Sequence, residues 1–151
     1  MYLLDTNVIS ELRRTRAANA HPSVTEWASD VPAAFMFVSV ISIHELEHGI
    51  LLAERSDPTK GQLLRTWLDG SVIPAFADRI VNVDLPVVRR AARAHVPDPA
   101  PFRDALIGAT AFVHGMVLVT RNVRDFDRFA DLEVFDPWTY KRFPRDMSVA
   151  D

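Results

Sequence analysis

The 151-residue chain contains no cysteine, which excludes disulfides and thiolate metal ligands. It also has no apolar run of the ~18–20 residues that a membrane-spanning helix needs. No basic stretch leads into an apolar segment at the N-terminus, as it would in a secretory signal. Because these three features are missing, we expect a cytoplasmic protein that works away from membranes.

A surplus of positive charge is missing as well, since the formal net charge is -3. The overall charge is therefore not that of a typical nucleic-acid-binding protein. Basic residues nevertheless gather near both ends of the chain, at positions 13–16 and 121–145. Such clusters are either solvated surface or a phosphate-binding track beside an acidic centre, and the sequence leaves both interpretations open.

The residues that are present, 48% hydrophobic and 25% charged, are typical of a soluble globular domain. Short apolar runs predict five buried strands at residues 2–4, 35–40, 79–83, 116–120 and 133–135. Apolar residues at helical spacing predict helices around residues 8–12, 43–53, 63–68, 87–95 and 104–113. Gly70, Pro74 and Gly115 predict helix ends. This alternation indicates an α/β protein, with one three-layer α/β/α domain over residues 1–151 and a parallel sheet of about five strands.

A carboxylate follows the first predicted strand directly, at Asp5. A carboxylate buried there without a partner would be costly, whereas a metal ion or backbone donors would stabilise it. The carboxyl ends of parallel strands are also where ligands bind in open α/β sheets. Four more polar residues fall at strand ends or at the starts of the adjacent helices: Glu45, Asp104, Asn122 and Asp125.

Each of these acidic residues also has a local explanation. Asp5 or Thr6 could cap the first helix, and residues 42–45 fit a capping box that would account for Glu45. Asp104 suits the first turn of a helix, and Asp125 could cap a short helical turn. Taken together, however, they predict an acidic pocket, for which Mg²⁺ or Mn²⁺ is the natural counter-ion. Such a pocket suits the hydrolysis of phosphodiester bonds.

The same segments make the chain similar to a known family. Residues 3–10, 42–49, 103–111, 118–126 and 134–138 resemble, in order, the PIN-domain ribonucleases and specifically the VapC-type toxins of toxin–antitoxin pairs. The resemblance implies a Mg²⁺-dependent endoribonuclease in which Mn²⁺ is a plausible substitute. It also implies a homodimer, an RNA substrate, and a cognate antitoxin that inserts a chain segment into the active-site groove.

The resemblance assigns the three core acidic positions of the family to Asp5, Glu45 and Asp104. Family members carry a further acidic residue at the position of Asn122 or slightly later, and here the candidates are Asn122 and Asp125. Asn122 could ligate a metal through its carbonyl but brings no charge. One firmly bound metal, joined by a second together with RNA, is therefore compatible with this sequence.

The expected chemistry divides the site into three groups of residues. Asp5 and Asp104 would bind the metal directly, while Glu45 and Asp125 would position or deprotonate the attacking water. Four polar side chains would order these groups by hydrogen bonds: Thr6, Asn7, Thr120 and Asn122. Two arginines would contact flanking phosphates or only balance the acidic residues: Arg121 and Arg124.

Three other interpretations compete with this one. Residues 44–48 fit the H-E-x-x-H pattern of zinc metalloproteases, in which His44 and His48 would bind Zn²⁺ and Glu45 would be the general base. A phosphotransfer domain with an aspartate nucleophile would also place a carboxylate after its first strand, but position 7 is asparagine and no lysine follows a later core strand. A catalytically silent RNA- or protein-binding module remains the third. The C-terminal run 141–151 is either an arm that packs on a partner or a loose tail.

Overall fold

The computed structural model describes residues 1–143, and its centre is a five-stranded parallel sheet. The strands are β1 (Tyr2–Leu4), β2 (Met36–Ser39), β3 (Ile80–Val81), β4 (Val117–Val119) and β5 (Val134–Phe135). They lie in the order β3-β2-β1-β4-β5, and every neighbouring pair is parallel. The structure confirms the predicted parallel sheet and the positions of all five strands, although β3 is shorter than expected.

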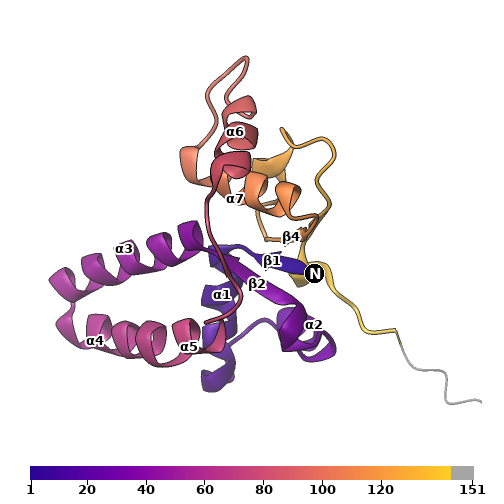
Figure 1. Ribbon diagram of the computed structural model, residues 1–151. Coiled ribbons are helices and arrows are strands. Elements are labelled where there is room, and N and C mark those ends of the chain that lie inside the picture. The colour runs from indigo at the N-terminus through magenta and orange to yellow at the C-terminus, as the bar shows by residue number, and fades with distance from the viewer. Residues whose placement is uncertain (144–151) are drawn as a thin grey trace, which may run out of the picture.

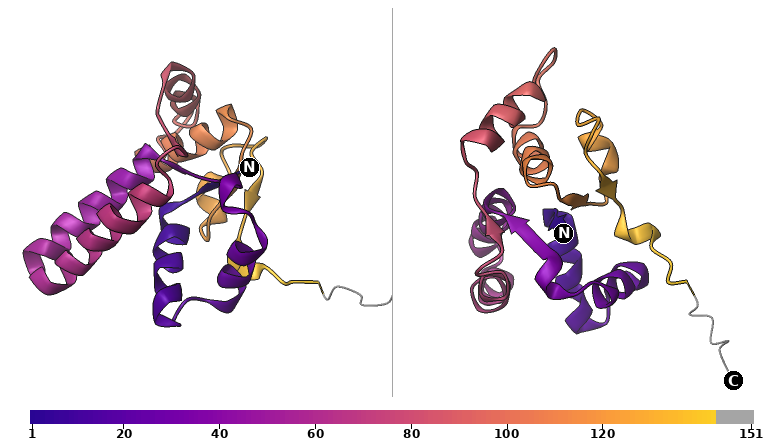
Figure 2. Two further views of the ribbon diagram at one scale, coloured as in Figure 1. Left: turned by 60° about the horizontal axis from the view of Figure 1, so that its bottom comes forward. Right: turned by 45° about the vertical axis from the view of Figure 1, so that its right-hand side comes forward.

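Helices connect successive strands and cover both faces of the sheet (Figures 1 and 2). Between β1 and β2 lie α1 (Thr6–Arg13), a 3-10 turn η1 (Arg14–Ala17), α2 (Pro22–Asp30) and a second 3-10 turn η2 (Ala33–Phe35). Between β2 and β3 lie α3 (Val40–Ser56), α4 (Pro58–Trp67), a π-helical turn η3 (Leu68–Val72) and α5 (Ile73–Ala75). Between β3 and β4 lie α6 (Leu85–Arg93) and α7 (Phe102–Val113). Two 3-10 turns follow β4 and β5, η4 (Val123–Phe126) and η5 (Pro137–Thr139).

Alternate residues of β1 enter two separate hydrophobic cores. Leu3 is fully buried against α6 and α7, whereas Leu4 is fully buried against α1, α2 and α3. This is the result expected for a strand whose successive side chains point to opposite faces of a covered sheet. The three-layer α/β/α architecture is therefore confirmed. None of the helices in residues 1–143 is long and apolar enough to cross a membrane.

The helices α3 and α4 form a long hairpin that extends away from the sheet (Figure 1). The two helices approach closely at Gly61, where an added Cβ would lie 2.4 Å from the Cα atom of Glu54. Arg65 of α4 joins the hairpin by ion pairs, with Nη1 2.6 Å from Glu47 and Nε 2.9 Å from Glu54. The two helices are therefore in backbone contact at Gly61 and are linked by ion pairs at Arg65.

The structure differs from the sequence-based expectation at three places. Helix α2 was not predicted, although Pro22 begins it and Trp27 is buried on the sheet. Helical backbone continues past Gly70 to residue 75, because the wider turn η3 accommodates Pro74, which has no N–H to donate. The predicted capping box at residues 42–45 is wrong, since the N-cap of α3 is Ser39, whose Oγ accepts a hydrogen bond from the N–H of Ile41 at 3.1 Å.

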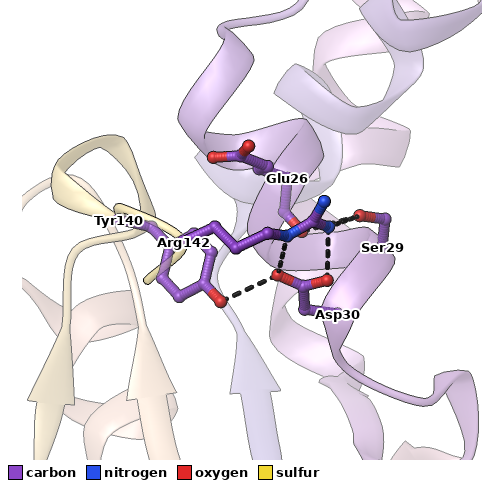
Figure 3. Close-up of polar contacts among 5 residues, drawn as sticks. All are labelled: Glu26, Ser29, Asp30, Tyr140 and Arg142. Atoms are coloured by element: carbon purple, nitrogen blue, oxygen red, sulfur yellow. Dashed lines mark hydrogen bonds and ion pairs between the residues drawn. The ribbon is translucent and has the colours of Figure 1, made fainter. Parts of the chain in front are cut away.

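After β5, the chain packs against α2 and is fastened there by polar contacts (Figure 3). The Tyr140 hydroxyl donates to Oδ2 of Asp30 at 2.8 Å, and Nε of Arg142 donates to the same oxygen at 2.9 Å. The Nη2 atom of Arg142 pairs with the other oxygen of Asp30 and donates to Ser29 at 3.2 Å. Of the C-terminal run 141–151, Arg142 is thus bound to α2 of the same chain and Phe143 is 88% exposed, while residues 144–151 lie outside the described residues. Packing of this run on a partner stays a prediction.

Candidate metal centre

The predicted site residues lie where the winding of the sheet reverses. Helices after β1 lead to β2 on one side, while β4 pairs with β1 on its other side. Ligands bind at such a switch point, outside the carboxyl ends of the strands. Asp5 and Thr120 come directly after these two central strands, and the N–H of Asp5 donates to the carbonyl of Val119 at 2.9 Å.

Asp5 is buried, with 7% of its surface exposed, and it uses both carboxylate oxygens. Oδ1 accepts from the N–H of Thr6 at 2.8 Å, so Asp5 is the N-cap of α1 as predicted. Oδ2 accepts from the hydroxyl of Thr120 at 2.7 Å. Burial raises the pKa of Asp5 above its ordinary value; these hydrogen bonds oppose the rise, and the negative charges of Glu45 and Asp125 add to it. Asp5 therefore serves the helix and the acidic cluster at once.

Asn7 and Thr120 join the two loops that flank Asp5. The Asn7 amide donates to the Thr120 hydroxyl at 3.1 Å and, more weakly, to Oδ2 of Asp5 at 3.4 Å. The Asn7 carbonyl accepts from the N–H of Arg121 at 3.3 Å, and the Thr120 hydroxyl accepts from the N–H of Asn122 at 3.1 Å. Residues 113 positions apart are thus held in one network, which fixes the orientation of the Asp5 carboxylate.

Glu45 lies in the second turn of α3, beyond the reach of the helix N-terminus. Its Oε1 accepts from the hydroxyl of Thr6 at 2.8 Å, and its Oε2 is 3.7 Å from Nη1 of Arg103. Because Ser39 caps the helix instead, no local capping role explains this glutamate. Its contacts come from α1 and α7, both at the carboxyl edge of the sheet.

Asp104 lies in the first turn of α7, as predicted, and its pKa is raised from 3.8 to about 6. Desolvation by burial is the largest cause, followed by the negative charges of Asp5, Asp125 and Glu45; the positive charge of Arg103 opposes the rise. Asp104 and Asp5, from distant parts of the chain, are therefore close enough to Glu45 and Asp125 to be affected by their negative charges. Their repulsion would be relieved by a cation.

The remaining predicted residues are less central. Asp125 is exposed on η4, and its charge raises the pKa of both Asp5 and Asp104. Asn122 occupies the N-cap position of η4 without a side-chain cap and donates its N–H to Thr120. Arg121 places its guanidinium 5.2 Å from the ring centroid of Trp138. Arg124 is also exposed on η4.

The side-chain atoms that could ligate a metal at this cluster are oxygens, and oxygen ligands suit Mg²⁺ better than Zn²⁺. Nowhere in residues 1–143 do three His, Asp or Glu side chains converge closely enough to hold one metal ion. Mg²⁺ needs only one or two carboxylates, because it keeps several waters. A catalytic zinc site needs three protein ligands. His44 and His48 are exposed with ring centroids 6.4 Å apart, and Glu45 is engaged by Thr6, so the zinc interpretation fits poorly.

The fold and the cluster together define an α/β protein with an oxygen-lined acidic centre at the carboxyl edge of a parallel sheet. Arg103 is the residue at this centre that sequence reasoning missed as a functional candidate, although its position beside Asp104 was a visible signal. A family model described as the PIN domain matches residues 2–132. The chain belongs to the PIN domain family.

Individual relatives extend the match over nearly the whole chain. The toxin FitB of Neisseria gonorrhoeae is 35% identical over 144 residues, which cover 91% of this chain and 99% of that protein. The VapC ribonuclease Y4jK of Sinorhizobium fredii is 32% identical over 143 residues, covering 91% of this chain and 98% of that one. A solved structure of FitAB bound to an IR36 DNA fragment superposes with a TM-score of 0.81, at 31% identity over 94% of this chain and 99% of that chain.

Proposed function

We propose that this protein is a divalent-metal-dependent endoribonuclease that acts as the toxin of a toxin–antitoxin pair. The observation that carries the proposal is the gathering of Asp5, Glu45 and Asp125 around Asp104 at the switch point, where burial and their charges raise the pKa of Asp104 to about 6. The names of two full-length relatives, a toxin and a ribonuclease, point the same way. The proposed metal is Mg²⁺, with Mn²⁺ as a substitute.

In this proposal Asp5 and Asp104 hold the metal, which would stabilise charge on the scissile phosphate and lower the pKa of a bound water. Thr120 and the N–H of Thr6 keep the Asp5 carboxylate in one orientation. This orientation is preorganised, since both donors lie in regular elements or at their ends. Asp104 must be ionised to bind a cation, so we expect metal affinity to rise as the pH passes about 6.

Glu45 is the residue best placed to orient the attacking water and accept its proton. The hydroxyl of Thr6 donates a hydrogen bond to only one of the two carboxylate oxygens of Glu45. Asp125 is the proposed fourth acidic residue, in preference to Asn122, because its charge acts on both Asp5 and Asp104. In the reaction the water oxygen bonds to phosphorus, one P–O ester bond breaks, and the departing oxygen takes up a proton from solvent.

The binding partners of this site are part of the proposal. Arg121 and Arg124, on the loop after β4, would contact phosphates on either side of the scissile bond. A cognate antitoxin would neutralise the nuclease, and the FitAB assembly in the solved structure supports a second protein as partner. We also propose a homodimer in which each chain is a single PIN domain over residues 1–151.

The test is RNA cleavage with Mg²⁺ or Mn²⁺ by the wild-type protein and by Asp5→Ala and Asp5→Asn, all purified identically. We expect metal-dependent cleavage by the wild type and a loss of at least about 100-fold in both variants, because each removes a charged metal ligand. Asparagine is also a good N-cap, so Asp5→Asn should keep the thermal stability of the wild type while alanine costs about 1 kcal/mol.

The controls separate the possible failures. Equal cleavage by all three proteins would mean a contaminating ribonuclease. A wild type that neither cleaves varied RNAs nor binds Mn²⁺ in calorimetry would overturn the proposal and favour a silent binding module.

A further inference from the structure

Arg103 is the cation that the fold places against the acidic cluster. It precedes Asp104 in the first turn of α7, and α7 approaches α3 at the carboxyl edge of the sheet (Figure 1). Its Nη1 atom lies 3.7 Å from Oε2 of Glu45. Within residues 1–143 this is the only ion pair made by any of the four clustered carboxylates.

The contact between Arg103 and Glu45 is loose. A separation of 3.7 Å exceeds the 2.7–3.2 Å of an N–H···O hydrogen bond, and 48% of the Arg103 side chain is exposed. Exposed ion pairs of this kind contribute little to stability, so Arg103 can leave Glu45 at small cost. Glu45 stays in place without it, because the hydroxyl of Thr6 holds the other oxygen at 2.8 Å.

Other arginines near the site are arranged differently. The guanidinium of Arg121 lies over the ring of Trp138, 5.2 Å from its centroid, which restricts its movement. Arg124 lies on η4, whereas Arg103 belongs to the same helical turn as a proposed metal ligand. A phosphate bound to a metal at Asp104 would lie near the Arg103 guanidinium, because that guanidinium already contacts Glu45 of the same acidic cluster.

We propose that Arg103 is a phosphate-binding residue of the nuclease that rests on Glu45 until RNA arrives; this inference depends on the proposed function. A guanidinium binds phosphate oxygens in a bidentate manner and remains charged at any working pH. When RNA enters, the Arg103 guanidinium leaves the carboxylate of Glu45 and binds oxygens of an RNA phosphate instead. The exchange releases Oε2 of Glu45 to contact the attacking water at the moment when substrate is present.

One substitution should then move two affinities in opposite directions. Arg103→Ala makes the cluster more negative, so it should bind Mn²⁺ about 3- to 10-fold more tightly in calorimetry without RNA. It also removes a charge-assisted phosphate contact, so it should bind a fluorescent oligoribonucleotide about 10- to 30-fold more weakly. RNA binding is measured by anisotropy in Ca²⁺ under conditions where the oligonucleotide stays intact.

Two further variants act as controls. Arg103→Lys keeps the charge but loses the bidentate geometry, so its Mn²⁺ affinity should equal that of the wild type while its RNA affinity is only partly restored. Arg89→Ala removes the same charge from the exposed surface of α6 and should leave both affinities unchanged.

The proposal is overturned if Arg103→Ala binds RNA as the wild type does, whether or not Mn²⁺ binding tightens, because Arg103 would then be only a counter-ion or a surface residue. The wild-type cleavage assay keeps this result separate from the proposed function. If the wild type cleaves RNA and Arg103→Ala binds RNA as tightly as the wild type, only the role of Arg103 is refuted. If the wild type neither binds Mn²⁺ nor cleaves RNA, both the proposed function and the role of Arg103 are refuted.

Discussion

Asp104 is the carboxylate whose ionisation is most clearly disfavoured by burial and by its acidic neighbours. Its folded-state pKa of about 6 lies above its ordinary 3.8, so the folded chain holds this proton more tightly than the unfolded chain does. The contribution of the group to stability is therefore complete below about pH 4 and is lost as the pH rises through 6. At neutral pH the ionised Asp104 destabilises the metal-free fold.

Asp104→Asn tests this sign. In the presence of a chelator at pH 7.5, we expect the variant to be more stable than the wild type by about 1 kcal/mol, after a discount for solvent screening of this half-buried group. The corresponding rise in Tm is about 2–4 °C for a chain of this size. At pH 4 the difference should vanish, and Asp131→Asn on an exposed loop controls for the substitution itself. Equal stability of wild type and Asp104→Asn at pH 7.5 would contradict the raised pKa.

At the scale of the elements, the α3–α4 hairpin depends on one close approach. A Cβ at Gly61 would lie 2.4 Å from the backbone of Glu54, a distance that real Cβ contacts do not reach. Gly61→Ala should therefore push the helices apart and destabilise the protein by about 1–3 kcal/mol in urea unfolding. Gly49, within α3, has no atom within 4 Å of an added Cβ.

Gly49→Ala is consequently the matched control, with the opposite expected sign. Alanine is a better helix former than glycine, so this variant should gain about 0.5–1 kcal/mol. If both alanine variants shift the urea midpoint in the same direction, the hairpin is not limited by the contact at Gly61.

The elements also show how far the sequence was informative. Strand ends were predictable because buried strands are continuous apolar runs, which placed Asp5 at the carboxyl edge of the sheet. The helical spacing before β4 placed Asp104 at the start of a helix at the same edge. Glu45 was harder to interpret, because its local pattern fits a capping box and only the fold shows that Ser39 is the cap. The bond from Thr6 to Glu45 joins residues 39 positions apart, and no local pattern encodes it.

At the scale of the whole molecule, the C-terminal arm is tied to α2 across 110 positions of sequence (Figure 3). The chain has only two tyrosines, Tyr2 and Tyr140, so the ionisation of the Tyr140 phenol can be followed by ultraviolet titration. The hydrogen bond from the Tyr140 phenol to the Asp30 carboxylate raises the pKa of Tyr140 above its ordinary 10, with burial and the charge of Asp30 adding to it.

In a Tyr2→Phe background, we therefore expect Tyr140 to ionise above pH 10. Asp30→Asn should bring the phenol back toward 10, since it removes the charged acceptor. A titration midpoint that does not move between the two proteins would show that the arm is not held on α2 in solution.

The two cores of the protein are built by successive parts of the chain: helices α1 to α5 cover one face of the sheet, and α6 and α7 cover the other. Asp5 and Glu45 thus belong to the part that the ribosome makes first, while Asp104, Asp125 and the Thr120 hydroxyl that orients Asp5 are made later. Of the four carboxylates of the site, a growing polypeptide carries only Asp5 and Glu45 until residue 104 is added, and it carries all four once Asp125 is added. Any activity of the site would therefore require synthesis through residue 125, so that shorter nascent chains would be inactive.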